Sequence, residues 1–162
     1  MQMTNENDTI LNYWKDGIPD DRVAHLIKDA TRALVRSLQN KLKEHGVPFG
    51  HWSILRILWV QDGLSQRELS SMAGIMESTT ANVVRQMEAK GQISRRHLGK
   101  NMRKQHVFLT EKGKKMEYVL VPLAKRVNSA ANKNINERDI KALRKTLIKM
   151  IENLGSEELN SK

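Results

Sequence analysis

The chain has 162 residues, enough for one domain with a sizeable core, and its 28 lysines and arginines exceed its 18 acidic residues, giving a formal net charge of +10. This excess favours a polyanionic partner. The absence of cysteine excludes disulfides, thiolate metal sites and cysteine-based redox sensing. No apolar run approaches the length of a membrane span and no signal-peptide pattern opens the chain, so we expect a cytoplasmic protein without membrane association.

A long amphipathic helix is predicted near the N-terminus, over residues 19–46. Pro19 and the acidic residues after it favour a first helical turn, and Gly46 favours the end of the helix. Apolar side chains recur along it at helical spacing: Val23, Leu26 or Ile27, Ala30, Leu34, Leu38 and Leu42. A second apolar helix is predicted over His51–Gln61.

The next stretch has the pattern of a helix, a tight turn and another helix. Ser65 and Glu68 have the spacing of a capping box, in which each side chain satisfies a free N–H group of the first helical turn. Gly74 suits the turn between the two helices. The second of them is predicted over Glu77–Lys90, and its core-facing side chains are Thr80, Val83, Val84 and Met87.

The opposite face of the Glu77–Lys90 helix is polar. It carries short polar side chains and one cation: Ser78, Thr79, Asn82, Arg85 and Gln86. Side chains of these types read base edges and hold phosphates in DNA complexes. The pattern therefore predicts that this helix contacts DNA through these five residues.

Two segments of alternating polarity follow, near Ile93–Arg96 and Gln105–Leu109, and the loop between them is basic. A two-stranded hairpin with a basic tip is a wing, so residues 51–113 are expected to form a winged helix-turn-helix. The side chains expected to contact phosphates are Arg95, Arg96, Lys100 and Lys104. Arg103 is expected to reach the adjacent minor groove.

The positive charge is concentrated on this winged module. Residues 1–64 hold 8 basic and 8 acidic residues, residues 65–115 hold 11 and 4, and residues 116–162 hold 9 and 6, so the net charges are 0, +7 and +3. A solvated surface explains a basic protein in general. It does not explain an excess gathered on the part that would meet DNA.

Two more helices are predicted after the wing. Thr110 caps the first of them, in which Pro122 introduces a bend, and Gly155 closes the second. Their apolar stripes, like that of the N-terminal helix, are wider than a small winged module can cover. We therefore expect a homodimer in which residues 19–46 and 114–155 of each subunit interdigitate, and an intramolecular bundle is the alternative.

No catalytic or metal site is indicated. The five histidines lie on separate predicted elements. His25 and Asp29 are four residues apart and could share a metal ion, but two ligands are weak support, and a solvated pair is the alternative. No glycine-rich phosphate loop follows a strand, and no serine stands in a nucleophile-elbow sequence. We expect no enzyme activity and no cofactor.

Several motifs of the chain resemble the MarR family of bacterial regulators. They are LSQREL at Leu64–Leu69, TTANVVRQMEAKG at Thr79–Gly91, NMRK at Asn101–Lys104 and VFLTEKG at Val107–Gly113. The resemblance extends over most of the chain and implies a mainly α fold with a small β-hairpin wing, flanked by long N- and C-terminal dimerisation helices. Two residues depart from it: Asn101 replaces the usual wing acid, and Arg85 stands where relatives often carry aspartate.

The resemblance also implies a small-molecule effector. Members of the family often bind aromatic or phenolic acids in a crevice between the dimer helices and the winged module. The residues that could line such a crevice here are Arg22, His25, His51 and Trp52. The alternative is that Trp52 belongs to the core and that the other three are solvated.

These observations lead to one hypothesis and two alternatives. The hypothesis is a dimeric, sequence-specific transcriptional regulator that acts as a repressor. It binds a pseudopalindromic operator in double-stranded DNA, where it is associated with the nucleoid, and a small effector releases it. The first alternative is an architectural DNA-binding protein of low sequence specificity. The second is a winged domain used only for protein interaction, whose basic face is incidental.

Overall fold

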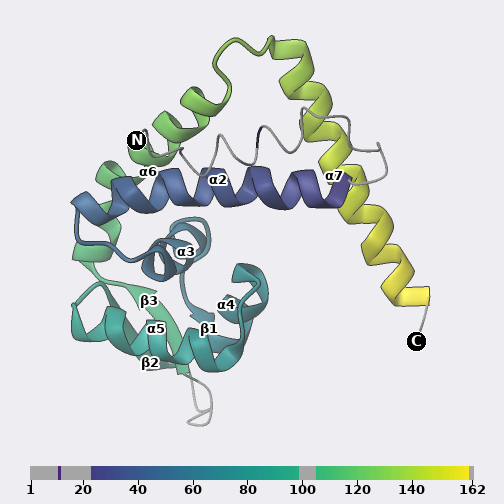
Figure 1. The fold of residues 1–162 in the computed structure, drawn as a ribbon. Helices are drawn as coiled ribbons and strands as arrows, with labels where there is room; N and C mark the ends of the chain where they lie inside the picture. The colour runs from purple at the N-terminus through teal and green to yellow at the C-terminus, as the bar shows by residue number, and fades with distance from the viewer. Residues whose placement is uncertain (1–10, 12–22, 99–104, 161–162) are drawn as a thin grey trace, which may run out of the picture. The chain divides into compact units, whose positions relative to one another are not determined.

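The computed structural model describes residue 11 and residues 23–98 and 105–160. Residues 1–127 and 128–162 form two separate compact units. The elements are, in order, α2 (Val23–Glu44), α3 (Phe49–Leu58), β1 (Leu64–Ser65), α4 (Gln66–Ala73), α5 (Glu77–Ala89), β2 (Ile93–His97), β3 (Gln105–Leu109), α6 (Glu111–Ala131) and α7 (Glu137–Asn160) (Figure 1). The predicted fold class, mainly α with a winged helix-turn-helix, is confirmed.

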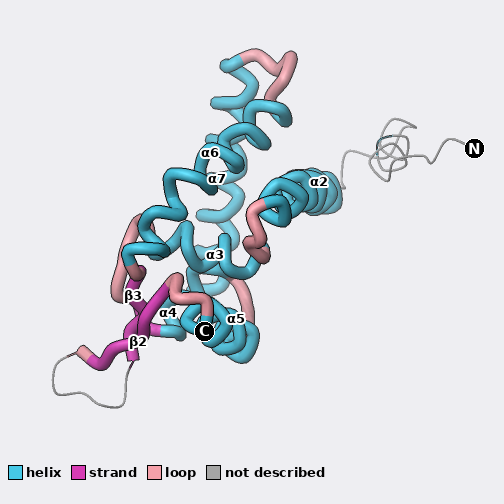
Figure 2. The backbone as a smooth tube through the Cα atoms, turned by 90° about the vertical axis from the view of Figure 1, so that its left-hand side faces the viewer, coloured by secondary structure: helices cyan, strands magenta, loops and turns pink. Residues whose placement is uncertain are grey.

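The sheet has three antiparallel strands in the order β1-β3-β2, one more than the predicted hairpin. Figure 2 shows the two longer strands, β2 and β3, side by side. The extra strand pairs Leu64 with Val107, while Ile93 on β2 pairs with Leu109 on the other edge of β3. A two-residue strand has no alternating pattern of its own, and only its long-range pairing with β3 defines it. The sequence therefore predicted the two longer strands and missed β1.

The predicted helix caps are confirmed. At the start of α4, the Ser65 N–H group donates to the Glu68 carboxylate at 2.7 Å, and the Glu68 N–H group donates to the Ser65 hydroxyl at 3.3 Å. Gly74 ends α4 with a left-handed backbone, φ 64°. The Thr110 hydroxyl accepts from the Gly113 N–H group at 3.1 Å and so caps α6.

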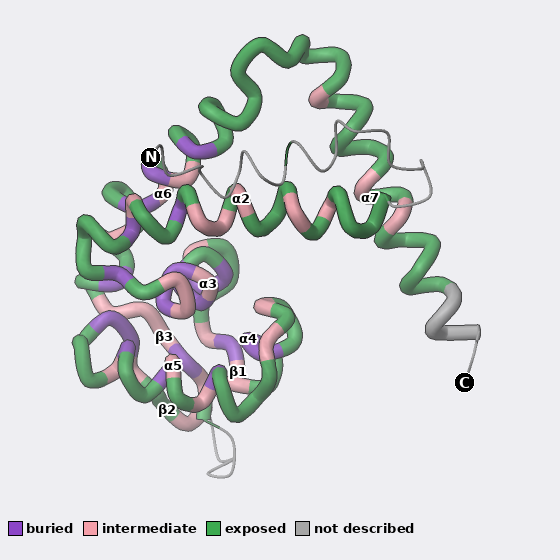
Figure 3. Tube along the Cα trace, in the orientation of Figure 1, coloured by how far each residue is buried: buried purple, intermediate pink, exposed green. Residues whose placement is uncertain are grey.

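Helix α3 forms the centre of the core (Figure 3). Its buried side chains are His51, Trp52, Ile54, Leu55, Ile57 and Leu58. A helix that is buried nearly all round must be covered by its neighbours on several sides. Side chains that cover it come from α4, α5, both long strands and α6: Leu69, Val84, Met87, Ile93, Val107, Leu120, Leu123 and Val127.

Two helix boundaries differ from the predictions. Helix α3 begins at Phe49 rather than His51, because Pro48 takes an extended conformation at the N-cap and leaves Phe49 free to enter the first turn. Helix α7 continues through Gly155 to Asn160. A glycine inside a helix costs only about 1 kcal/mol relative to alanine, so it need not end one.

The apolar stripes on the long helices are present and largely exposed. In α2 only Leu38 and Leu42 are buried, and Val23 and Leu26 are each 48% exposed. In α7 no side chain within the described residues is buried, and Ile151 is 71% exposed. Apolar surface of this extent favours a covering partner.

Helix α6 begins so close to the turn before β2 that no side chain fits between them. A Cβ atom on Gly113 would lie 2.1 Å from the backbone oxygen of Gln92, which cannot move without breaking its bond to the Thr110 N–H group (3.1 Å). We therefore expect Gly113→Ala to lower the free energy of unfolding by at least about 2 kcal/mol, measured by urea denaturation. Gly155→Ala is the matched control, because a Cβ atom there meets nothing within 4 Å and alanine favours the helix. Equal stability of the two variants would contradict the close approach.

Candidate nucleic-acid interface

Helix α5 separates its side chains as the sequence predicted. Thr80, Val84 and Met87 are buried against the core, and Val83 is half-buried. All of the predicted DNA contacts on this helix are exposed: Ser78, Thr79, Asn82, Arg85 and Gln86. The structure thus brings the five polar side chains together on the solvent face of one helix, where a nucleic acid can reach them.

The two wing arginines that the structure describes are held by protein groups. The Arg95 guanidinium donates to the Glu88 carboxylate through Nε at 3.0 Å and through Nη2 at 2.5 Å. This hydrogen bond lowers the pKa of Glu88 and raises that of Arg95. Arg96 stacks over Phe108, with its guanidinium carbon 4.1 Å from the ring centre. Arg95 therefore joins β2 to the end of α5 in addition to its predicted role at phosphates.

The predicted wing-tip contacts lie outside the described residues. They are Lys100, Arg103 and Lys104, and Asn101 lies there too.

A buried polar junction connects four elements beside the DNA face. The Gln92 carbonyl accepts from the Thr110 N–H group at 3.1 Å and from the Thr110 hydroxyl at 3.0 Å. The Gln92 side chain lies 2.8 Å from Nδ1 of His51, whose Nε2 lies 3.5 Å from the Gln86 side chain. The junction therefore links α3, α5, the turn before β2 and the start of α6. The burial of Gln92 was not predicted, because a single polar residue after Gly91 has no local signal of burial in the sequence.

Two of the predicted crevice residues belong to the core. His51 is 1% exposed and Trp52 is 8% exposed, and both belong to the core around α3. His25 is exposed on α2, and Arg22 lies outside the described residues. The core role weighed for Trp52 therefore also applies to His51, whose ring has no surface open to a ligand in this conformation. The periodicity of a short apolar helix does not show which of its faces is covered.

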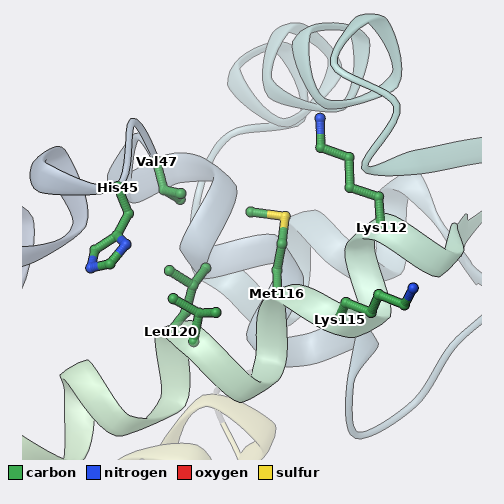
Figure 4. Close-up of a pocket in the computed structure, with 7 residues that line it drawn as sticks. His45, Val47, Lys112, Lys115, Met116 and Leu120 are labelled. Carbon is green, nitrogen blue, oxygen red and sulfur yellow. The ribbon is translucent and has the colours of Figure 1, made fainter.

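A pocket of about 470 Å³ lies elsewhere, between the end of α2 and the start of α6 (Figure 4). Its lining combines an apolar floor with basic groups at its edge: His45, Val47, Lys112, Lys115, Met116, Val119 and Leu120. The Lys112 ammonium group also donates to the backbone carbonyl of Lys90 at the end of α5, at 2.7 Å. Lys112 thus connects the pocket to the end of α5.

The fold agrees with that of known proteins. The model of the MarR family matches residues 50–104, the part that holds most of α3, the helix-turn-helix and β2. The chain therefore contains a MarR-family region. MarR-family proteins are DNA-binding transcriptional regulators, and the predicted family is confirmed.

Similar proteins include regulators from several bacteria. The chain is 26% identical over 144 residues to the HTH-type transcriptional regulator TtmR of Methylorubrum extorquens. The match covers 86% of this chain and 73% of TtmR. A putative MarR-family regulator from Listeria monocytogenes was solved in complex with a 26mer DNA. It superposes with a TM-score of 0.77 at 24% identity, and the match covers 86% of this chain and 92% of the Listeria chain. Bordetella bronchiseptica BpsR, whose DNA binding is regulated by 6-hydroxynicotinic acid, has a TM-score of 0.73 at 22% identity, over 80% and 98% of the two chains.

Two kinds of feature are absent from the part of the chain that the structure describes. None of its helices there is both long enough and apolar enough to span a membrane. Within the same residues, no group of three histidine or carboxylate side chains is placed to hold a metal ion. Asp29, which could have shared a metal with His25, forms a salt bridge instead: its Oδ1 atom lies 3.6 Å from Nη2 of Arg32.

The burial of His51 predicts how the stability of the protein depends on pH. Burial, which is the largest cause, and nearby Lys90 lower the pKa of His51 below its ordinary value of 6.5. The unfolded chain therefore binds a proton near pH 6.5 that the folded chain binds only at lower pH, so stability should fall as the pH drops below 6.5. We expect His51→Gln to reduce this loss, measured as the difference in Tm between pH 7.5 and pH 5.5. The exposed His25→Gln serves as the matched control, and an unchanged pH dependence in His51→Gln would contradict the prediction.

Proposed function

We propose that the protein is a dimeric, sequence-specific repressor that binds operator DNA with one α5 helix per half-site. The observation that carries this proposal is the division of α5 into a buried stripe and an exposed polar face. In the proposed complex α5 enters the major groove, and Ser78, Thr79, Asn82, Arg85 and Gln86 contact base edges and nearby phosphates. The Listeria protein solved with a 26mer DNA supports this docking by analogy of fold.

The wing supplies phosphate contacts in this proposal. Arg96 is exposed on β2, and Lys100, Arg103 and Lys104 follow it in the sequence, outside the described residues. Arg95 reaches a phosphate while it remains bound to Glu88, because a guanidinium has five N–H groups and the printed bonds to the carboxylate use only some of them. These contacts provide affinity with little base preference, and α5 provides the preference.

Base reading by α5 can be tested with one substitution. We expect Asn82→Ala to relax the preference at particular base pairs by about 1–3 kcal/mol, because its amide can form a bidentate contact with a base. The measurement is the dissociation constant for a selected operator and for a panel of single-base variants at fixed salt.

Asn128→Ala, on the exposed surface of α6, is the matched control. If Asn82→Ala weakened binding to operator and random DNA equally, Asn82 would not read bases. If the wild-type protein bound all sequences alike, the chain would be an architectural DNA-binding protein instead.

The proposal of a dimer rests on the exposed apolar side chains of α2 and α7. Leu143, Ile151 and Leu154 on α7 are all more than half exposed, and burial of apolar surface contributes roughly 25 cal/mol per Å². A second copy of the chain carries the same uncovered stripes and can cover them reciprocally. Two subunits would also place two α5 helices for successive half-sites of an operator.

Light scattering should therefore give about twice the chain mass of 18.6 kDa. We expect Ile151→Glu to shift the protein toward monomer and to weaken operator binding at least tenfold, because a charge in the apolar interface is costly and a single half-site binds poorly. Asn153→Glu, on the same helix but outside the apolar stripe, is the matched control. A wild-type monomer at micromolar concentration would exclude the dimer.

We further propose that a small aromatic acid regulates DNA binding from the pocket between α2 and α6. Val47, Met116 and Leu120 offer an apolar surface to a ring, and the ammonium groups of Lys112 and Lys115 can pair with a carboxylate. The effect of 6-hydroxynicotinic acid on BpsR gives a precedent for a ligand of this class. This pocket is distinct from the crevice predicted from Arg22, His25, His51 and Trp52, which His51 and Trp52 could line only after a rearrangement of the core.

This site can be tested with 6-hydroxynicotinic acid and salicylic acid as probes. We expect a probe that binds to raise the Tm of the wild-type protein and to lose affinity when operator DNA is present, by the same factor by which it weakens DNA binding. Lys115→Met should reduce the shift in Tm, whereas Lys125→Met, outside the pocket on the same helix, should not. Probe affinity that is independent of DNA would exclude this regulation.

A further inference from the structure

One buried side chain contacts the DNA face from inside the molecule. His51 is 1% exposed and belongs to α3, yet its Nε2 atom lies 3.5 Å from Oε1 of Gln86 on the solvent face of α5, with the amide in the orientation that the structure records. Its other ring nitrogen, Nδ1, lies 2.8 Å from Oε1 of Gln92. The imidazole ring therefore bridges a buried amide and an exposed amide.

The state of the ring follows from its surroundings. Burial disfavours the charged imidazolium, so the ring is neutral at pH 7 and has one N–H group and one acceptor nitrogen. The 2.8 Å contact is the stronger of the two and assigns the N–H group to Nδ1, which donates to the Gln92 oxygen. Nε2 is then an acceptor, and the side chain within reach of it, Gln86, can satisfy it with an N–H group.

The requirement at Nε2 sets the orientation of the Gln86 amide. The oxygen and nitrogen ends of an amide have nearly the same shape, so a rotation by 180° exchanges them without displacing other atoms. With the nitrogen end turned toward the ring, the contact at 3.5 Å becomes N–H···N, which closer packing against DNA can shorten. The carbonyl oxygen and the second N–H hydrogen then remain available on the exposed face.

We propose that His51 is a positioning residue for base recognition, which holds Gln86 with its nitrogen toward the core and its carbonyl oxygen toward DNA. The inference rests on the proposed function, in which α5 lies in the major groove. A carbonyl oxygen accepts from the amino groups of adenine or cytosine, and only adenine also offers N7 to the remaining N–H group. Gln86 therefore selects adenine at the base pair it contacts, and guanine and thymine present no amino group there.

Without His51 the Gln86 amide has no partner that distinguishes its two ends. Both orientations are then populated, and the oxygen-outward orientation must be selected from the mixture each time DNA binds. The expected consequence is a lower preference for adenine at one base pair, while preferences set by other side chains remain. This pattern differs from that of a purely structural residue, whose loss weakens binding to every sequence.

The first test uses the wild-type chain and needs no substitution. A two-bond ¹H–¹⁵N correlation spectrum at pH 7.5 identifies which nitrogen of each histidine carries the proton, and His51→Gln assigns the His51 signals by their disappearance. The expected result is the tautomer with the proton on Nδ1. A proton on Nε2 overturns the proposal, because the ring would then donate to Gln86 and turn its oxygen inward.

The second test compares binding profiles on single-base variants of a duplex that the wild-type protein selects from random DNA. We expect Gln86→Ala to reduce adenine preference at one base pair from about tenfold to about twofold. His51→Leu should do the same at the same base pair, and the double variant should lose no more than either single one. His51→Leu and Asn82→Ala, which is the control pair, should affect different base pairs and should add.

The outcomes separate the inference from the function on which it rests. If Gln86→Ala changes no base preference, α5 does not read DNA through Gln86, and both the contact and the inference fail. If Gln86→Ala changes one base pair but His51→Leu weakens all sequences evenly, base reading stands and the positioning role fails. If His51→Leu does not fold, the tautomer measurement on the wild-type chain still decides the proposal.

Discussion

The contact between the Gln92 backbone and the first turn of α6 is the constraint on which the winged module depends. Gly113 has no side chain, and this lets the Thr110 hydroxyl and N–H group both reach the Gln92 carbonyl. The Trp59 indole N–H group donates to the Gly113 carbonyl at 3.0 Å, so α3 is fixed at the same point. One close approach thus sets where α5 ends, where β2 begins and where α6 leaves the module.

The sequence predicted those parts of the fold that local patterns determine. The caps at Ser65 and Thr110, the turn at Gly74 and the exposed face of α5 follow from the types and spacing of nearby residues, and the structure agrees with them. The pairs that define β1 and the polar junction join residues about 40 apart, such as His51 with Gln92. Sequence spacing contains no information on such pairs, so β1 and the burial of His51 required the structure.

The basic face is organised by pairing as well as by net charge. Within residues 65–115 the pairing of Arg95 with Glu88 leaves the sum of charges unchanged, but it fixes a guanidinium at the base of the wing beside the end of α5. The Arg96 guanidinium stacks over the ring of Phe108. Two fixed cations lose less conformational entropy on binding a phosphate than two mobile ones, so their ordering favours DNA binding.

The proposed regulation by an anion in the α2–α6 pocket has a direct route to α5. The Lys112 ammonium group lines the pocket and also donates to the Lys90 carbonyl, where it satisfies the last turn of the recognition helix and interacts favourably with the negative end of its dipole. A carboxylate in the pocket competes for that ammonium group, because a charged acceptor binds it more strongly than a backbone carbonyl. The end of α5 then loses a partner while the polar junction at Gln92 still holds the start of α6. A ligand that favours this altered end by about 3 kcal/mol would weaken operator binding more than a hundredfold, and bound DNA would weaken the ligand equally.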